Sequence, residues 1–224
     1  AGITTDMLAG AGALKRVEAV YIGLFQFGMA YNFRRGVEAG EIEVRDFPET
    51  AMIARFRAAS QGLSFMPTKV LLGTGMAAHN PEQIREITCP FTGEKYHAVE
   101  AARSDFTVIH GYVGDEFGNV QWPVQRDSDD IDFLIAKAAN RLIVTVERIV
   151  PHEEILRQPT LTYVPHQWVE AIVEVPYGAH PGSCDGYYDE DEEHMIYYQE
   201  CAKEPGRFKE YAAKYLSLIH ISEP

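Results

Sequence analysis

The chain has 224 residues, a formal net charge of -13 at pH 7 and an apolar fraction of 46%. This length suits one α/β domain, and the ordinary mix of apolar and charged residues excludes wholesale disorder, coiled coils and collagen-like repeats. The acidic balance, without any run of lysine and arginine, argues against a nucleic-acid surface, because phosphate binding needs clustered positive charge.

Apolar runs rich in β-branched and aromatic residues predict buried strands, and they alternate with helical patterns. Helices are predicted over residues 32–39, closed by Gly40, over 48–61, closed by Gly62, and over 131–140. Such alternation predicts parallel βαβ units, so the expected fold is α/β: a doubly wound, mostly parallel sheet with helices on both faces. The strands are expected at residues 17–25, 42–47, 70–72, 106–110, 142–150 and 169–175.

Two stretches break this alternation. Residues 76–101 are polar and punctuated by proline and glycine, and residues 176–186 form a Pro/Gly-rich segment after the last strong strand. Long loops of this kind usually serve a site or an interface. The acidic run over residues 185–193 is interpreted as a solvated loop before a helix that starts near residue 190.

The two ends of the chain do not have the pattern of domain boundaries. Ala1 leads directly into a helix start near Thr4, so an upstream segment is expected. The last residues resemble translated sequencing-adapter sequence, and residues 217–224 are expected to be a non-native tail. The sequence therefore predicts one subunit domain over residues 1–216, incomplete at its N-terminus.

Cysteine content and hydropathy bear on the cellular compartment. Cys89, Cys184 and Cys201 are odd in number and far apart, which predicts neither a disulfide framework nor a zinc site. No apolar run reaches the roughly 18 residues of a spanning helix, and no signal segment is visible. We expect a cytoplasmic protein without contact to a membrane.

Glu49 is the first candidate for chemistry. It follows the predicted strand at 42–47 and lies in the first turn of the next helix. Ligands of open α/β sheets bind beyond the carboxyl ends of the strands, and a carboxylate there could act as nucleophile or general base. An acidic residue in a first turn is also common simply because it complements the helix dipole.

Two further segments are candidates for binding. Gly73, Thr74 and Gly75 end the predicted strand at 70–72, where their backbone N–H groups could approach a carbonyl or phosphate oxygen, although glycines also suit an ordinary turn. His180 lies in the loop after the final strand, where an imidazole could donate to an acyl oxygen, line a pocket or only hydrogen-bond within its loop.

Other reactive side chains lack the partners that a catalytic or metal-binding pattern requires. Cys184 lies close to His180 in sequence, but no third group is apparent that would orient a thiol–imidazole pair. His110 ends the predicted strand at 106–110 and is interpreted as a satisfied core histidine. His194 lacks a second ligand at helical spacing, so no metal site is predicted.

Taken together, several ordered segments resemble the A-type half of glutaconate-type class I coenzyme A transferases. The resemblance extends from residue 1 to about residue 215, and the combination of segments is far more specific than any single one. The segments are residues 7–12, 47–59, 62–67, 105–110, 118–120, 138–147 and 177–181.

This resemblance implies a fold shared with sugar-phosphate isomerases and a hetero-oligomer with a B-type CoA-transferase chain. It also implies ping-pong chemistry through a glutamate of the B-type chain, within a Glu-Asn-Gly motif that this sequence does not contain. The expected substrates are an acyl-CoA and a carboxylic acid, with coenzyme A as substrate and no further cofactor. An A-type chain alone is expected to be inactive, with Glu49, the 73–75 turn and His180 shaping the acyl pocket.

Two alternatives stay open from the sequence. A related branch, the A-type chain of a ring-cleaving CoA-thioester hydrolase, has a catalytic glutamate at the position that Glu49 resembles. In that case Glu49 would be the base or nucleophile of hydrolysis. The second alternative is a non-catalytic scaffold that only stabilises its partner.

Overall fold

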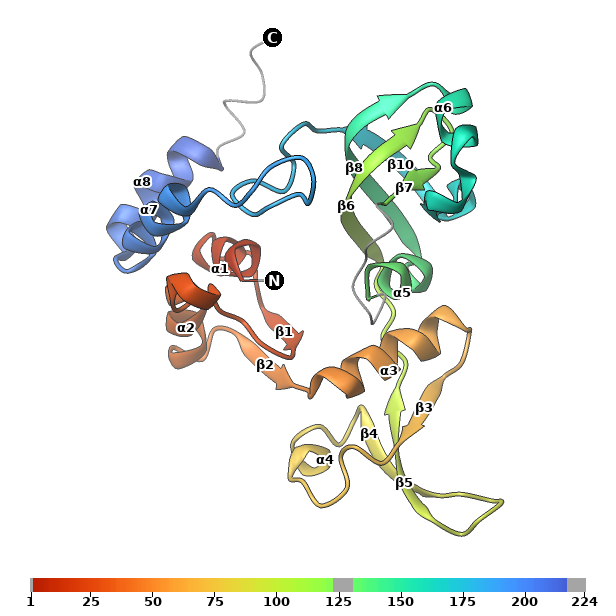
Figure 1. The fold of residues 1–224 in the computed structure, drawn as a ribbon. Coiled ribbons are helices and arrows are strands. Elements are labelled where there is room, and N and C mark those ends of the chain that lie inside the picture. Colours follow the sequence, from red (N-terminus) through yellow and green to blue (C-terminus); the bar gives the residue numbers. More distant parts are fainter. Residues whose placement is uncertain (1, 123–130, 217–224) are drawn as a thin grey trace. The chain divides into compact units, whose positions relative to one another are not determined.

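Two compact units divide the chain in the computed structural model, which describes residues 2–122 and 131–216. The first unit comprises Ala1–Phe47 and Glu190–Pro224, and the second unit is Pro48–Asp189. Helices and strands of both units can be followed in Figure 1. The single domain predicted over residues 1–216 stays a prediction, and the predicted tail at 217–224 lies outside the described residues.

The first unit brings the two ends of the described chain together. Two strands, β1 (Arg16–Ala19) and β2 (Glu43–Asp46), pair in parallel with Arg16 opposite Glu43. The α2 helix is followed by Gly40 at a φ of 72°, a left-handed conformation that ends helices and suits glycine. The helical elements are α1 (Ile3–Gly10), η1 (Phe25–Phe27), α2 (Tyr31–Glu38), α7 (Glu192–Ala202) and α8 (Pro205–Tyr215).

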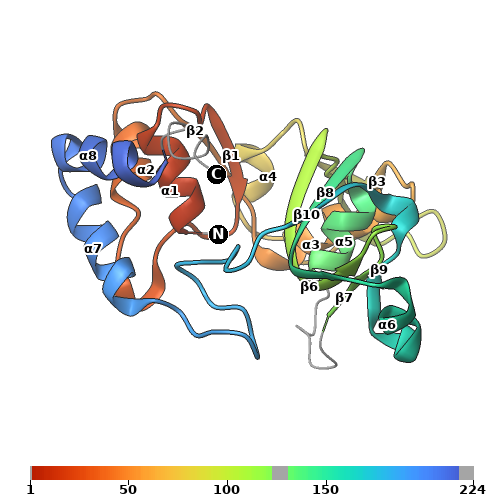
Figure 2. The ribbon, with the colours of Figure 1, turned by 90° about the horizontal axis from the view of Figure 1, so that it is seen from above.

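A helical core closes this unit. Leu24 packs with side chains of α7 and α8, and helices α7 and α8 lie beside α1 and α2 in Figure 2. The α7 helix begins at Glu192, close to the start predicted near residue 190, with the Asp191 side chain accepting a 2.8 Å hydrogen bond from the His194 N–H. The buried members are Leu24, Met195, Tyr198, Cys201, Ala202, Phe208 and Tyr211.

A five-stranded sheet forms the larger part of the second unit, in the order β10-β8-β6-β7-β9. Strands β6 (Phe106–Asp115), β8 (Arg141–Val150) and β10 (Val169–Glu174) are parallel, as predicted, whereas β7 (Val120–Gln121) and β9 (Thr162–Val164) add antiparallel pairs. The α/β class is confirmed. Helices α5 (Ile131–Ala138) and α6 (His152–Arg157) pack against strands of this sheet, with short helical turns η2 (Pro159–Leu161) and η3 (His166–Trp168) beside them.

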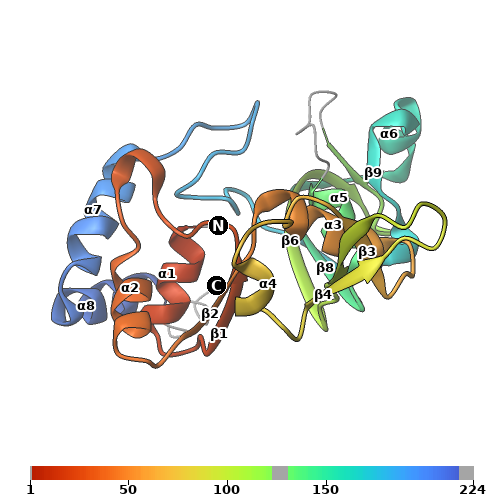
Figure 3. The same ribbon diagram turned by 90° about the horizontal axis from the view of Figure 1, so that it is seen from below.

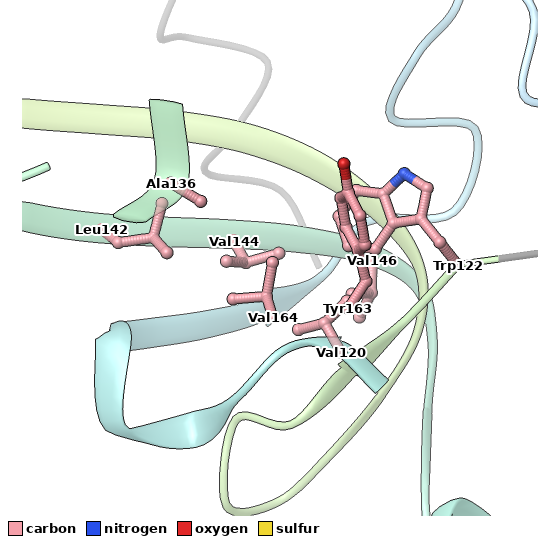
Figure 4. Packing of buried hydrophobic residues seen from close by; sticks show 8 residues of the cluster. All are labelled: Val120, Trp122, Ala136, Leu142, Val144, Val146, Tyr163 and Val164. Atoms are coloured by element: carbon pink, nitrogen blue, oxygen red, sulfur yellow. The ribbon is translucent and has the colours of Figure 1, made fainter. Parts of the chain in front are cut away.

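The core of the sheet explains its predicted strands. Every second residue of β8 is buried, from Leu142 through Val144 to Val146, because successive side chains of a strand point to opposite faces. Figure 4 shows these side chains packed against Val164 and the rings of Trp122 and Tyr163. The ring centroids of Trp122 and Tyr163 lie 5.0 Å apart, and this contact joins the end of β7 to β9 within the same apolar core.

A separate three-stranded antiparallel sheet corrects the loop predicted over residues 76–101. That stretch contains α4 (Met76–His79), β4 (Ile84–Thr88) and β5 (Lys95–Glu100), with β5 between β3 (Phe65–Thr68) and β4 (Figure 1). Figure 3 shows α4, β3 and β4 from below. Burial alternates in β5, where His97 and Val99 are buried and Tyr96 and Ala98 are half-buried, and the strand packs against α3 (Glu49–Ser60). Strands that mix polar and apolar residues do not appear in the sequence as continuous apolar runs, so they were not predicted.

Two predicted strands are also corrected. Residues 70–72 form a turn, in which Leu72 N–H bonds to the Lys69 carbonyl, rather than a strand. The strand predicted at 17–25 ends at Ala19, and the rest of that apolar run leads to Leu24 in the helical core. Among the described residues, no helix combines the length and apolar character that crossing a membrane requires.

Candidate functional site

The parallel register of β6 and β8 places three polar side chains side by side. His110 of β6 lies directly opposite Thr145 of β8, and Glu147 lies two residues further along β8. Residues two apart project from the same face of a strand, so all three side chains leave the sheet on the face opposite Val144 and Val146. This face receives the loop that follows β10.

His110 is hydrogen-bonded through both ring nitrogens. Its Nδ1 lies 2.8 Å from Thr145 Oγ1, and its Nε2 lies 2.7 Å from Glu147 Oε1. The side chain of His110 is 15% exposed and that of Glu147 is 5% exposed. A carboxylate buried to this degree is stable only where donors surround it.

The loop over residues 175–189 supplies those donors. Tyr177 N–H donates to Glu147 Oε2 at 2.8 Å, and the Tyr188 hydroxyl donates to Glu147 Oε1 at 2.7 Å. The Tyr188 oxygen in turn accepts a 3.0 Å hydrogen bond from Ala179 N–H. One carboxylate therefore joins two strands of the sheet to both sides of the loop.

Burial and hydrogen bonds shift the pKa values of Glu147 and Tyr188 in opposite directions. Burial alone would raise the pKa of Glu147, but hydrogen bonds from Tyr177, Tyr188 and His110 outweigh it and lower this pKa below its ordinary value. Burial and the hydrogen bond to Glu147 raise the pKa of Tyr188 to about 12. At neutral pH the site thus holds one carboxylate and a tyrosine that keeps its proton.

Cys184 completes a group of side chains with metal-binding atoms. Its sulfur, a nitrogen of His110 and an oxygen of Glu147 all lie within 4.8 Å of one another. Burial and the negative charges of Glu147 and Asp185 raise the pKa of the Cys184 thiol to about 11. A metal ion would need this thiol deprotonated and would have to replace the proton between His110 and Glu147.

Glu49 is the first residue of α3, as predicted, and follows Pro48 at the N-cap position. It is exposed, in contrast to the buried Glu147. The carboxylate lies in the first turn, where it complements the positive end of the helix. Its chemical role stays a prediction.

The segment Gly73–Gly75 lies in the turn before α4, and all three residues are exposed. Gly73 has a φ of 78°, a conformation that glycine adopts without strain. The Thr74 hydroxyl donates to the Leu71 carbonyl at 2.8 Å and accepts from Met76 N–H at 3.3 Å, so it shapes the turn itself. A binding role for these residues stays a prediction.

His180 lies in the loop over residues 175–189, as predicted, and is exposed. Its N–H bonds to the Tyr177 carbonyl at 2.9 Å. The structure thus connects His180, through the backbone, to the residue that Glu147 holds. Glu49, Thr74 and His180 come from three different elements of the second unit: α3, the turn before α4 and this loop.

Sequence reasoning did not single out Glu147, and it took His110 for a core residue. His110 is in the middle of β6, which continues to Asp115, and its ring takes part in a polar network. One signal was available for Glu147. A glutamate inside a mostly apolar strand has to find partners, because charged side chains are almost never buried alone.

Comparison with known proteins places this chain in a family. The sequence model described as "Coenzyme A transferase" matches residues 1–175. The chain belongs to the coenzyme A transferase family. The A-type chain of glutaconate CoA-transferase from Acidaminococcus fermentans is 31% identical, over 96% of this chain and 72% of that protein. The crystal structure of that enzyme superposes with a TM-score of 0.89.

Other similar proteins differ from this chain in length. A protein of Archaeoglobus fulgidus is 36% identical over 94% of this chain, and the chain spans only 46% of that relative. The IpdA component of a cholesterol ring-cleaving hydrolase from Rhodococcus jostii is 30% identical over 96% of this chain and 75% of that component. The predicted resemblance to coenzyme A transferases is confirmed, and so is the fold expected from it.

Proposed function

We propose that this chain is the A-type half of a heteromeric transferase that moves coenzyme A from an acyl-CoA to a carboxylic acid. The likeness of nearly the whole chain to its counterpart in glutaconate CoA-transferase, in sequence and in fold, carries this proposal. The covalent glutamate is assigned to a B-type partner chain. Coenzyme A enters as part of the substrate, and the proposal includes no resident cofactor or metal.

The carboxylates of this chain support a nucleophile on the partner chain. Both oxygens of Glu147 accept hydrogen bonds, from Tyr177 and Tyr188 among others, and such engaged lone pairs attack a carbonyl poorly. Glu49 is exposed at the start of α3. The 224 residues contain no Glu-Asn-Gly sequence, the motif that the family resemblance links to the nucleophile.

The proposed reaction balances without further reactants. The glutamate carboxylate of the B-type chain attacks the thioester carbonyl, and the coenzyme A thiolate leaves as an acyl–glutamyl anhydride forms. The thiolate then attacks the glutamyl carbonyl of the anhydride, which releases the donor acid and leaves a glutamyl-CoA thioester. The acceptor acid then reacts with the glutamyl-CoA thioester through the same two steps in reverse order, which gives the acceptor acyl-CoA and the free glutamate.

Within this scheme the chain shapes the pocket for the acyl group. His180 in the loop over residues 175–189 and the turn Gly73–Gly75 are the residues we propose for contact with the substrate. Glu49 is proposed as a wall of the pocket, with its charge stabilised by the N-terminus of α3. Neither hydrolysis through Glu49 nor a pure scaffold role is favoured by the comparisons.

Trapping the covalent intermediate tests the assignment. This chain, copurified with its B-type partner, would be incubated with acyl-CoA and then with hydroxylamine, which converts a glutamyl thioester to a hydroxamate and releases the thiol. We expect the hydroxamate on a peptide of the B-type partner. A hydroxamate on the Glu49 or Glu147 peptide of this chain would overturn the proposal.

The Glu49→Gln variant separates transfer from hydrolysis. We expect the variant complex to keep CoA transfer within about tenfold of the parent, because a wall residue contributes little to the barrier. Loss of activity by several orders of magnitude, with an intact complex, would instead assign the chemistry to Glu49. Gln at this position keeps the size of the side chain and one acceptor oxygen, and it removes the charge.

A further inference from the structure

The loop after β10 begins with a strained backbone conformation. Tyr177 has a φ of 60°, in the left-handed region that residues with a Cβ seldom adopt. Its N–H donates to Glu147 Oε2 at 2.8 Å, and its ring lies 5.1 Å from the ring of Tyr188. Strain of this kind persists only where the surroundings hold it, and Glu147 provides that hold.

The imidazole of His110 supports the next residue. A Cβ added to Gly178 would lie 2.5 Å from His110 Cε1 and 2.9 Å from the Val175 carbonyl oxygen, so the Gly178 backbone rests directly on the ring. Hydrogen bonds to Thr145 and Glu147 fix both nitrogens of that ring. The His110 ring on which the Gly178 backbone packs is therefore held in one orientation.

Tyr188 holds the other side of the loop to the same carboxylate. Its hydroxyl donates to Glu147 Oε1 and accepts from Ala179 N–H, while its backbone pairs with Cys184 in an antiparallel bridge. The segment from Tyr177 to Ala179 is thus attached at two N–H groups, one directly and one through a hydroxyl. His180 follows at once, with its own N–H bonded to the Tyr177 carbonyl.

We infer that Glu147 is a positioning residue, whose buried carboxylate fixes the loop over residues 177–180 and thereby the position of His180. Three donors converge on it: Tyr177 N–H, the Tyr188 hydroxyl and His110 Nε2. An anion accepts from all of them, whereas an amide in its place would turn a donor toward one of them. That this loop borders the acyl group rests on the proposed function, but its attachment to Glu147 does not.

Amide hydrogen exchange on the complex of this chain with its B-type partner tests the attachment. In Glu147→Gln, we expect the Tyr177 and Ala179 amides to exchange at least about tenfold faster, and by a larger factor than the amides of Arg141–Val150, whose exchange rises only through the lower global stability. Tyr188→Phe should speed exchange at Ala179 alone, because Tyr177 keeps its bond to Oε2. Glu170→Gln, which removes an exposed carboxylate of β10 that pairs with Arg141, is the matched control and should change neither amide.

The exchange rates of the Tyr177 and Ala179 amides decide whether Glu147 holds the loop. Unchanged exchange at Tyr177 in Glu147→Gln, with β8 still protected, would overturn it. If that variant loses protection in β8 as well, Tyr188→Phe decides: faster exchange at Ala179 alone supports the attachment, and no change overturns it. A tyrosine-selective NMR titration gives a second readout, since the pKa of Tyr188 should fall from about 12 in Glu147→Gln.

Kinetics then connect the loop to the proposed function. We expect Glu147→Gln to raise KM for the acyl-CoA more than it lowers kcat, because a displaced loop weakens binding while the nucleophile stays intact. A fall in kcat alone would contradict a positioning role. If the parent complex transfers no coenzyme A, the proposed function fails, and the exchange patterns still test the hold of Glu147 on the loop.

Discussion

The hydroxyl of Tyr198 donates a 2.6 Å hydrogen bond to Asp6, which precedes it by 192 residues in the chain. Asp6 is fully buried in α1 and also accepts from the Phe33 N–H at 2.7 Å and from Asn32 Nδ2 at 3.1 Å. This one carboxyl links α1, α2 and α7. It makes the first unit dependent on residues from both ends of the described chain.

The Tyr198→Phe variant should weaken this closure. Removing the hydroxyl leaves the buried Asp6 oxygen without that donor, which costs about 1–3 kcal/mol of unfolding free energy. Urea unfolding of the full chain measures this loss, and a separate amide-exchange experiment shows whether α1 and α7 lose protection. Tyr215→Phe, at a residue that is 42% exposed, is the control and should change stability by less than about 0.5 kcal/mol. Equal effects of the two variants would contradict the role of the contact.

Asp6 should make stability fall as pH rises. Burial raises the pKa of Asp6 above its ordinary value, although hydrogen bonds from Phe33, Tyr198 and Asn32 oppose it. A carboxyl whose pKa is higher in the folded state stabilises the fold in acid, below its unfolded pKa, and this contribution is lost as pH rises through the folded pKa. The stability difference between the parent and Asp6→Asn should therefore decline as pH rises above the ordinary Asp pKa of about 3.9. A difference independent of pH would contradict it.

Glu147 should show the opposite dependence. Its pKa is lowered in the folded state, because hydrogen bonds outweigh the effect of burial. Its contribution is present above the unfolded pKa and is lost as pH falls through the folded pKa. Urea unfolding should show Glu147→Gln less stable than the parent by about 3–5 kcal/mol at neutral pH, with the gap narrowing in acid. A gap that widens in acid would rule out the ionised carboxylate.

The Gly178→Ala variant should disturb the loop by a steric clash alone. Its Cβ would lie 2.5 Å from His110 Cε1 and 2.9 Å from a backbone carbonyl oxygen, so the loop has to move. We expect a loss of about 1–3 kcal/mol in urea unfolding. Gly206→Ala in α8 is the matched control, because among the described residues no atom outside its chain neighbours and its own helix backbone lies within 4 Å of the added Cβ, and it should be neutral or stabilising by up to about 1 kcal/mol. Equal stability of both variants would refute the clash.

The cysteines should differ in reactivity. Hydrogen bonds from the Thr92 side chain and from the backbone of Phe91 and Thr92 lower the pKa of the half-buried Cys89, whereas burial raises that of Cys184 to about 11. Because the thiolate is the reactive form, iodoacetamide at neutral pH should label Cys89 well before Cys184. Peptide mass spectrometry measures the order, and earlier labelling of Cys184 would show that its loop opens readily.

Much of the fold follows from pattern in the sequence. The parallel strands β6, β8 and β10 bury one face in an apolar core, and such strands read as apolar runs with flanking helices. The antiparallel strands β4 and β5 escaped prediction, because segments that mix polar and apolar residues, such as Lys95–Glu100, resemble a polar loop unless pairing is known. Pairing joins residues far apart in sequence, which local pattern does not record.

For the candidate site, sequence by itself determined which segments to examine: the resemblance to coenzyme A transferases and the loop that carries His180. Only the tertiary structure decided which side chains meet. The register of β6 against β8 places His110 opposite Thr145 and near Glu147, and the fold of the loop brings Tyr177 and Tyr188 onto that carboxylate. A buried charge exists only together with its donors, and those donors are assembled by contacts that span 30 or more residues of chain.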